Sequence, residues 1–347
     1  MPALTERRVP ATEPGRSTTQ AVSARVMGTD ADVIVVGHGP DPAALIERLR
    51  HLEQLWSRFR DDSELSRLGH AEGAPTVVSH ETAMLVERSL YAAARSGGRF
   101  DPTVLEALVA AGYDRDFDDV RSGSGTQVHR TRATADRAAP VVPGTDGIRV
   151  DVSSGLVVLP PGVRLDAGGI GKGLAADLTA VEAVDAGADA ALVSVGGDLR
   201  VAGTAPDEGW EIEVDHHCGP PARVNLRTGA LATSSTLRRR WTTGDGIAHH
   251  VIDPRTGRPA DGPAVSVSVL APEAWWAEAL ATTILVGFGE ADLDGQLPAL
   301  LSGAGCLVTT DDGARHRLGT LGHAFSVDDD PFRIPASEPM TSGEDLT

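Results

Sequence analysis

The sequence predicts a mixed α/β fold of the α+β class. Short runs rich in Val and Ile, which are typical of strands, occur between longer segments whose apolar residues recur at helical spacing. Pro- and Gly-rich turns separate these segments. With 347 residues, of which 41% are hydrophobic and 23% charged, the chain is long enough for one large core or two smaller ones.

The first half of the chain contains one predicted strand and two predicted helices. The β-branched run at 32–37 predicts the strand. A helix is expected over 42–59, with Asp41 as its N-cap and a proline at its first position. A second helix is expected over 80–95, where Ser79 is the N-cap and two glycines follow the end.

The second half alternates helices with strands. A helix over 172–186 follows a Gly-rich turn and precedes a strand at 191–195. Alternating Val and Ser residues predict another strand at 264–270. A helix over 272–286, with a proline at its first position, is expected next. Segment 115–161 is rich in Gly, Asp, Arg and Pro, so loops with short strands are expected there.

Two terminal segments, 1–20 and 326–347, are poor in core-forming residues and are predicted to be disordered. They leave residues 21–325 as a single folded domain. The first 26 residues contain no apolar run of signal-peptide length, and no stretch approaches the roughly 18–20 apolar residues of a membrane-spanning helix. We therefore expect a cytoplasmic protein without membrane insertion.

The formal net charge of −18 argues against nucleic acid as a partner, because the phosphate backbone must be neutralised by Lys and Arg. Such a chain must bind an anionic ligand locally, through backbone N–H groups, a few basic side chains or a cation. The arginines at 238–240, followed by Trp241, form a basic cluster. We expect this cluster to serve one phosphate or a salt bridge rather than RNA.

A Gly-rich turn, LDAGGIGKGLAAD at 165–177, stands before a predicted helix. Closely spaced glycines let the backbone approach a phosphate, and a helix N-terminus adds a favourable dipole. The turn is not a Walker A loop, since Gly173 follows Lys172, and Leu174 stands where a dinucleotide-binding fingerprint needs Gly or Ala. Alone, it is equally consistent with a tight turn that binds nothing.

Glu278 and Thr282 lie four residues apart in an otherwise apolar segment, so a helix would place both on one face. A carboxylate among apolar neighbours is costly to bury unless it is paired or bound to a metal. Carboxylate, hydroxyl and backbone carbonyl oxygens are ligands that suit Mg²⁺. The alternative is a glutamate at the helix edge and a threonine bonded to its own helix.

His250 follows a predicted strand and precedes the turn DPRTG at 253–257. A neutral imidazole beside a polar turn is a natural general base for a hydroxyl nucleophile. Asp253 could orient this imidazole, bind ribose hydroxyls or cap the turn. An isolated histidine is more often structural, so the interpretation of His250 depends on the segments around it.

Taken together, these segments resemble the FAD:protein FMN transferase (ApbE) family. Eight blocks occur in the order typical of the family across about residues 22–325. They are MGT (27–29), DSELSRL (62–68), GRFDPTV (98–104), LDAGGIGKGLAAD (165–177), VSVGGD (193–198), ATSSTLRR (232–239), HVIDPRTG (250–257) and AEALAT (277–282). The resemblance implies one globule of two closely packed lobes, with mixed sheets and flanking helices.

The resemblance also implies chemistry on FAD. The family binds FAD with Mg²⁺, cleaves its diphosphate and attaches FMN through a phosphoester bond to a threonine of a target flavoprotein, releasing AMP. By this resemblance His250 would take the proton of the acceptor, and Gly171, Glu278 and Thr282 would hold Mg²⁺. Flavin and nucleotide contacts would come from Met27, Phe59, Arg99, Phe100, Asp101, Lys172, Leu174, Thr233 and Asp253.

Several positions depart from the pattern of the family. Glu278 stands where the family has Asp, Gly171 where it has Ala, and Ser235 and Leu237 replace Gly and Tyr. The longer Glu side chain moves the carboxylate, and Mg²⁺ is sensitive to ligand geometry. Two alternatives therefore stay open: an FAD pyrophosphatase with water as the acceptor, and a non-catalytic flavin-binding protein.

Overall fold

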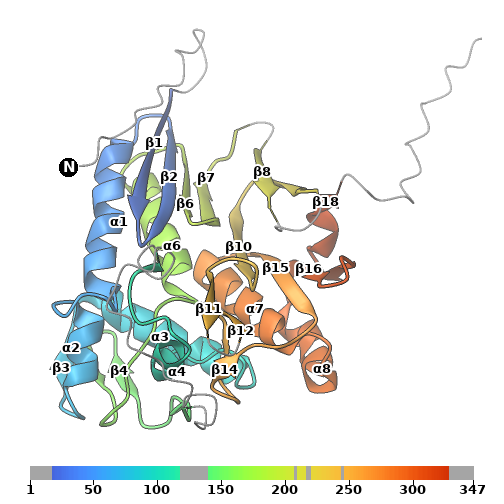
Figure 1. Cartoon of the computed structure of the whole chain (residues 1–347). Helices are drawn as coiled ribbons and strands as arrows, with labels where there is room; N and C mark the ends of the chain where they lie inside the picture. Colours follow the sequence, from blue (N-terminus) through green and yellow to red (C-terminus); the bar gives the residue numbers. More distant parts are fainter. Residues whose placement is uncertain (1–17, 118–139, 207–208, 216–219, 244–245, 328–347) are drawn as a thin grey trace, which may run out of the picture.

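The computed structural model is built around one eight-stranded antiparallel sheet (Figure 1). The described residues are 18–117, 140–206, 209–215, 220–243 and 246–327. In spatial order the strands of the large sheet are β1 (Thr19–Val26), β2 (Thr29–Val36), β6 (Ala190–Val195), β7 (Asp198–Gly203), β10 (Gly229–Ser235), β15 (Ala264–Ala271), β16 (Gly305–Thr310) and β17 (Arg315–Gly319).

Helices and small sheets surround this large sheet. The helices are α1 (Pro42–Trp56), α2 (Glu64–His70), α3 (His80–Arg95), α4 (Leu105–Ala110), α6 (Gly171–Asp185), α7 (Ala274–Gly287), α8 (Ala291–Leu300) and the short 3₁₀ helix η2 (Gly322–Ala324). The small sheets consist of β3 (Thr76–Val77), β5 (Leu156–Val158) and β4 (Arg149–Asp151); β18 (Ser326–Val327), β9 (Ala222–Leu226) and β8 (Trp210–Val214); β11 (Arg240–Thr243) and β12 (Gly246–His249); and β13 (Ile252–Asp253) and β14 (Arg258–Pro259). This combination confirms the α+β class.

The two faces of the large sheet bury different side chains, because residues alternate along each strand. On one face, Val193 of β6 belongs to the same core cluster as Leu49 of α1 and Leu174 of α6. On the other face, Leu192 packs in a cluster with Phe325 and with residues of β8 and β9. Helices α1, α6 and α7 therefore cover one face, and the small β8–β9–β18 sheet covers part of the other (Figure 1).

The helical face contains two hydrophobic clusters that meet at one residue. The first cluster joins α1 and α6 to β2 and β6, and the second joins α7 to β15 and β16. Trp276 packs against both. This arrangement fits the expected pair of closely packed lobes. None of the helices in the described ranges has the length and apolar character needed to cross a bilayer.

Helices α6 and α7 are joined at their N-terminal ends by two close contacts. A Cβ atom on Gly173 would lie 2.4 Å from the carbonyl oxygen of Ala274, so only glycine fits at this crossing. The N-cap residue of α7, Glu273, makes no side-chain capping bond. Instead, Asp177 of α6 accepts hydrogen bonds from the backbone N–H groups of Ala274 and Trp275, both at 2.9 Å. One helix thus supplies the cap of the other.

The predicted helices and strands are present with small shifts at their ends. The helix over 80–95 is α3, and the strands at 191–195 and 264–270 lie within β6 and β15. Helix α1 ends at Trp56 rather than near 59, because Ser57 is extended. Helix α7 begins at Ala274 and not at the proline two residues earlier, because Glu273 is still extended with φ −130° and ψ 143°.

The termini of the described chain are more ordered than the sequence predicts. The first two residues of β1, Thr19 and Gln20, fall in the segment predicted to be disordered, and so does β18. Both segments are held by strand pairing, β1 with β2 and β18 with β9, which sequence composition does not reveal. The rest of both predicted tails, residues 1–17 and 328–347, lies outside the described residues.

The capping carboxylate predicts a pH dependence of stability. Burial raises the pKa of Asp177 to about 6, opposed by its hydrogen bonds from Ala274 and Trp275. The folded chain binds the proton of Asp177 more tightly than the unfolded chain does, so protonation of Asp177 stabilises the fold. This stabilisation is complete below the unfolded pKa and is lost as pH rises through the folded pKa. Between about pH 5 and about pH 7 the wild type should lose about 1 kcal/mol of unfolding free energy relative to Asp177→Asn. Urea unfolding of both proteins at the two pH values measures this, and parallel pH curves would contradict it.

Candidate active site

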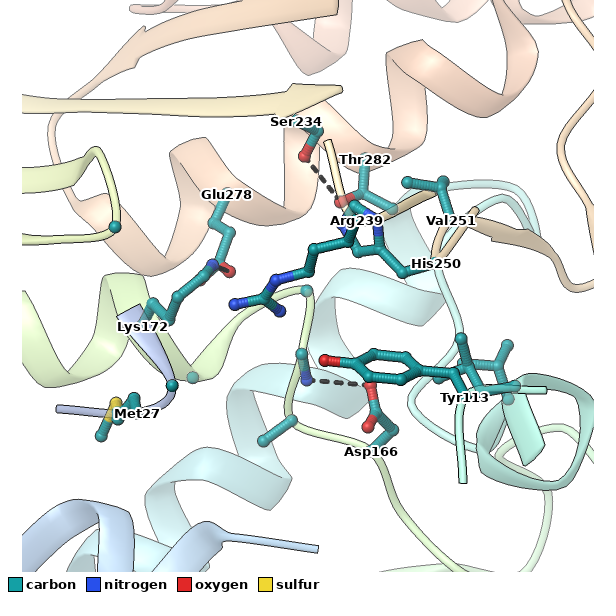
Figure 2. A pocket seen from close by; sticks show the side chains of 18 of the residues that line it. Met27, Tyr113, Asp166, Lys172, Ser234, Arg239, His250, Val251, Glu278 and Thr282 are labelled. Atoms are coloured by element: carbon teal, nitrogen blue, oxygen red, sulfur yellow. Dashed lines mark hydrogen bonds and ion pairs between the residues drawn. The ribbon is translucent and has the colours of Figure 1, made fainter. Parts of the chain in front are cut away.

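A cavity of about 490 Å³ opens where α6 and α7 begin (Figure 2). Its walls come from segments far apart in the sequence: the β1–β2 turn, the end of α1, the loop before α4, the Gly-rich turn, the end of β10, the turn after β12 and the inner face of α7. A volume of this size is in the range of small-molecule and cofactor sites.

Most of the residues predicted for the site line this one cavity. They are Met27, Phe59, Arg99, Phe100, Asp101, Gly171, Lys172, Thr233, His250, Glu278 and Thr282. Two others are not among the lining residues. Leu174 is 2% exposed in the core of α6, and Asp253 accepts hydrogen bonds from the backbone and side chain of Arg255, which makes it the cap of its own turn.

The floor of the cavity contains a cluster of three charged side chains. The Lys172 ammonium, at the start of α6, donates to the carboxylates of Asp198 and Glu278. Glu278 is only 2% exposed, and its second oxygen accepts a hydrogen bond from the backbone N–H of Gly173 at 2.8 Å. Asp198, at the start of β7, accepts from the backbone N–H of Thr233 at 3.0 Å. The cluster therefore ties both helices to the sheet.

The electrostatics of this cluster follow from burial. Burial raises the pKa of Glu278 to about 8, and the nearby carboxylate of Asp198 adds to the shift, while Lys172 opposes it. For Lys172, burial alone would lower the pKa, but Asp198 and Glu278 together raise it above its usual value. Two carboxylates share one ammonium, so the three groups carry an excess of negative charge when both carboxylates are ionised.

The two residues expected one helical turn apart on α7 do face the cavity together (Figure 2). Thr282 Oγ1 lies 3.1 Å from the hydroxyl oxygen of Ser234 at the end of β10. A Cβ on Gly169 would lie 3.5 Å from this same Thr282 oxygen and 3.1 Å from the ring of Phe100. The Gly-rich turn therefore approaches α7 closely enough for backbone and side-chain oxygens to converge.

His250 lies beside these groups and is kept neutral by its surroundings. Burial lowers its pKa well below the usual value, and the nearby Arg239, His249 and Lys172 lower it further. Its Nδ1 is buried and has no hydrogen-bond partner in the described part of the chain. The preceding His249 differs, since its Nε2 lies 3.0 Å from the carbonyl oxygen of Ala260 and its role is structural.

A wall of aromatic side chains lies opposite the charged cluster. The guanidinium of Arg58 lies 4.4 Å from the ring centroids of both Phe59 and Tyr113, and it pairs with Asp166 at 3.0 Å. The rings of Tyr113 and Trp241 are 5.6 Å apart. The guanidinium of Arg58 between two aromatic faces and the partly exposed ring of Phe59 make a flat surface suitable for a planar ligand.

Met27 occupies an unusual backbone conformation at the mouth of the cavity. Met27 and Gly28 form the two-residue turn between β1 and β2, with φ of 54° and 67°. Such turns favour Asn and Gly, and the left-handed region is unfavourable for a methionine. This backbone cost is consistent with a need for the Met27 side chain, which lines the cavity (Figure 2).

The guanidinium of Arg99, which was expected to contact the ligand, is paired with carboxylates of the protein instead. Arg99 is 1% exposed, and its guanidinium pairs with Glu290 at 2.7 Å and with Asp292 at 2.6 Å. Asp101 accepts hydrogen bonds from the backbone and hydroxyl of Thr103. Both residues therefore shape the loop before α4 while they line the cavity.

Several lining residues were not singled out from the sequence. They are Asp198, Ser234, Arg58, Tyr113, Asp166 and Arg239. Asp198 and Ser234 lie within blocks that carry the family resemblance, and the arginine run at 238–240 was visible as a basic cluster. Arg58 and Tyr113 have no motif of their own, so only the fold brings them to the cavity.

The ApbE family model matches residues 27–293, which include every segment around the cavity. The chain belongs to the ApbE family. It is 32% identical over 263 residues to the FAD:protein FMN transferase of Treponema pallidum, covering 69% of this chain and 68% of that protein. It is 29% identical over 291 residues to the FAD:protein FMN transferase of Salmonella typhimurium, covering 80% and 81%.

Solved structures of ApbE proteins have the same fold. The crystal structure of the ApbE protein of Thermotoga maritima superimposes with a TM-score of 0.76 at 26% identity, covering 88% of this chain and 99% of that one. The flavin transferase ApbE of Vibrio cholerae superimposes with a TM-score of 0.71 at 23% identity. The antiparallel sheet with flanking helices is therefore the ApbE fold, and the expectation of mixed sheets is corrected to antiparallel pairing throughout the described residues.

The donor groups at the α6–α7 junction fit a magnesium ion. Within the described ranges, no three His, Cys, Asp or Glu side chains gather as a metal site, so the protein ligands would be one carboxylate with neutral oxygens. Glu278, Thr282 and the backbone at Gly171, which all line the cavity, would provide this set, and the cluster around Lys172 would favour a cation when Asp198 and Glu278 are both ionised. Oxygen-only, partly filled sites of this kind suit Mg²⁺, which keeps waters and substrate phosphates as its other ligands.

The buried ion cluster predicts a large effect of its single cation on stability. Lys172→Met leaves two buried carboxylates without their ammonium, so the free energy of unfolding should fall by about 3–5 kcal/mol. Urea unfolding measures the change. Arg50→Met, which removes an exposed partner of Glu47, is the control and should cost less than about 1 kcal/mol. Equal losses in the two variants would contradict the importance of the cluster.

Proposed function

We propose that this chain is a Mg²⁺-dependent FAD:protein FMN transferase, which cleaves the diphosphate of FAD and attaches FMN to a threonine of a target flavoprotein, releasing AMP. The observation that carries the proposal is the convergence of a neutral His250, an acidic cluster around Glu278 and an aromatic wall on one cavity. Membership of the ApbE family and the names of the relatives support it.

His250 would act as the general base. Its lowered pKa keeps the ring neutral at physiological pH, so a ring nitrogen can accept a proton. The acceptor hydroxyl oxygen forms a bond to the phosphorus on the FMN side, and its proton moves to His250. The bond from that phosphorus to the bridging oxygen breaks, and its electron pair leaves with AMP. No oxidant or reductant takes part in the transfer.

Gly171, Glu278 and Thr282 would hold Mg²⁺, the first through its carbonyl oxygen and the others through their side chains. When bound, the ion supplies charge neutralisation to the diphosphate. Lys172 would help to orient the phosphates from the start of α6, where the helix dipole also favours an anion. In this way an acidic chain can bind an anionic substrate.

The flavin would lie against the side of the cavity that contains Met27, Phe59 and Phe100. Phe59 is exposed toward solvent, so its ring is available for stacking on a planar ligand. Thr233 would add a contact to the nucleotide, while Arg99 and Asp101 would act by holding the loop before α4 that forms part of the cavity wall. Leu174 and Asp253, which do not line the cavity, would act by supporting α6 and the turn after His250.

Incubation of the protein with FAD, Mg²⁺ and a candidate acceptor flavoprotein tests the proposed function. Covalent FMN on a threonine of the acceptor, with one AMP released for each FMN attached, is the expected result. Free FMN and AMP without modified acceptor would instead identify an FAD pyrophosphatase. Tightly bound but unchanged FAD, with every acceptor tried, would identify a flavin-binding protein.

His250→Ala should bind FAD with unchanged affinity and lose transfer. Removing a general base typically costs about 10²- to 10⁴-fold in rate. His249→Ala is the matched control, because it removes the neighbouring imidazole, which is bonded to the Ala260 carbonyl, and leaves the base in place. Quenched-flow measurement of FMN transfer tests this, and a wild-type rate for His250→Ala would rule out its role as base.

Glu278→Ala should raise the Mg²⁺ concentration needed for half-maximal turnover by more than about 10-fold, since even outer-shell partners of a metal contribute about 10- to 100-fold. Glu278→Asp, which introduces the residue typical of the family, is the control and should remain Mg²⁺-dependent. Calorimetric titration with Mg²⁺ gives the affinity independently of turnover. A wild-type Mg²⁺ affinity in Glu278→Ala would remove this residue from the metal shell.

A further inference from the structure

Arg239 stands out among the residues of the cavity by its backbone. It lies in the connection between β10 and β11 with φ of 45°, in the left-handed region. Of the three residues other than glycine with such a φ in the described ranges, two, Met27 and Arg239, line the cavity. This conformation is unfavourable for a long side chain and persists where the surroundings or the function require it.

The side chain of Arg239 extends from the chain beside His250 into the cavity, toward Lys172 and Glu278 (Figure 2). After burial, the positive charge of Arg239 has the largest effect on the pKa of His250, which is consistent with this proximity. An anion bound by Arg239 would therefore lie next to the proposed base.

The charge of Arg239 is uncompensated, in contrast to Lys172, Arg58 and Arg99, and unlike the exposed Arg238, which also lines the cavity, Arg239 is half-buried. Lys172 is paired with Asp198 and Glu278, Arg58 with Asp166, and Arg99 with Glu290 and Asp292. Among the described residues, Arg239 has no hydrogen bond, no ion pair and no ring contact, although its side chain is half-buried. A half-buried guanidinium that points into the cavity without a protein partner keeps its N–H donors available for an anionic ligand.

We propose that Arg239 binds the diphosphate of FAD, donating from its planar guanidinium to oxygens of the phosphorus that receives the acceptor hydroxyl. The inference rests on the proposed function for the identity of the substrate. Guanidinium groups match phosphate oxygens in a two-pronged geometry, and they stabilise charge on a phosphoryl group during transfer. Arg239 thereby contacts the phosphate that lies nearer His250, and the other phosphate lies nearer the cluster of Lys172, Asp198 and Glu278.

The neighbouring Arg240 provides a control that distinguishes a specific contact by Arg239 from the general effect of a basic surface. Arg240 is exposed and does not line the cavity, so its charge reaches the ligand only through solvent. Arg240→Gln removes the same charge one residue away and is the matched control. Arg239→Lys keeps the charge and loses the planar fork. Arg239→Gly removes the side chain and relieves the left-handed backbone, so this variant should fold at least as well as the wild type.

Equilibrium binding of FAD and riboflavin, without Mg²⁺ and without acceptor, tests the proposal. Arg239→Gln and Arg239→Gly should weaken FAD binding by roughly 10- to 100-fold, because a hydrogen bond to a charged group is lost, and leave riboflavin affinity unchanged. Arg239→Lys should lie between these variants and the wild type, and Arg240→Gln should bind FAD as the wild type does. In single turnover with acceptor, Arg239→Gln should also be slower at saturating FAD.

Unchanged FAD affinity in Arg239→Gln and Arg239→Gly, or an equal loss for FAD and riboflavin, would overturn the proposal. The failure of this proposal and the failure of the proposed function give different results. A wild type that binds FAD and transfers no FMN overturns the proposed transferase, while the ratio of FAD to riboflavin affinities in the variants still decides the role of Arg239. Thermal unfolding of each variant identifies any loss of binding that comes from misfolding.

Discussion

The contact between the first turns of α6 and α7 is the constraint on which the site depends. Gly173 allows the backbones to meet, and Asp177 completes the open end of α7 with two hydrogen bonds. The same contact places Lys172 opposite Glu278. Since α6 packs on β6 and β7 and α7 on β10 and β15, fixing this junction also fixes the two hydrophobic clusters relative to each other. Residues that hold the junction together, Gly173 and Asp177, therefore lie within two helical turns of Lys172, which faces the cavity.

The site concentrates charge where water is scarce. Asp198 and Glu278 are almost completely buried, and a single ammonium faces both. Burying ions in this way costs more than it returns in stability unless every partner is present. The arrangement is better understood as preparation for a cation and an anionic ligand than as a source of stability. The neutral His250 and the unpartnered Arg239 fit the same interpretation, because His250 can accept a proton and Arg239 can donate hydrogen bonds to a phosphate oxygen.

Much of the fold and the site could be predicted from local sequence. Caps at Asp41 and Ser79 and the apolar spacing behind them locate α1 and α3, because these signals act within a few residues. The spacing of Glu278 and Thr282 places both on one face of α7. The family blocks identify most residues of the cavity, since each block includes its own turn chemistry. The start of α7 does not follow from local sequence, because its cap is Asp177, 97 positions before Ala274 in the chain.

The sequence by itself therefore determined the α+β class, the family and the chemistry available at each block. Only the tertiary structure decided how these groups are paired: Lys172 with two carboxylates, Asp253 with Arg255, Arg99 with Glu290, and Arg239 with nothing in the described chain. The physical reason is that pairing and burial depend on contacts between segments up to nearly 200 positions apart, such as Arg99 and Glu290 with a separation of 191. No local pattern contains that information.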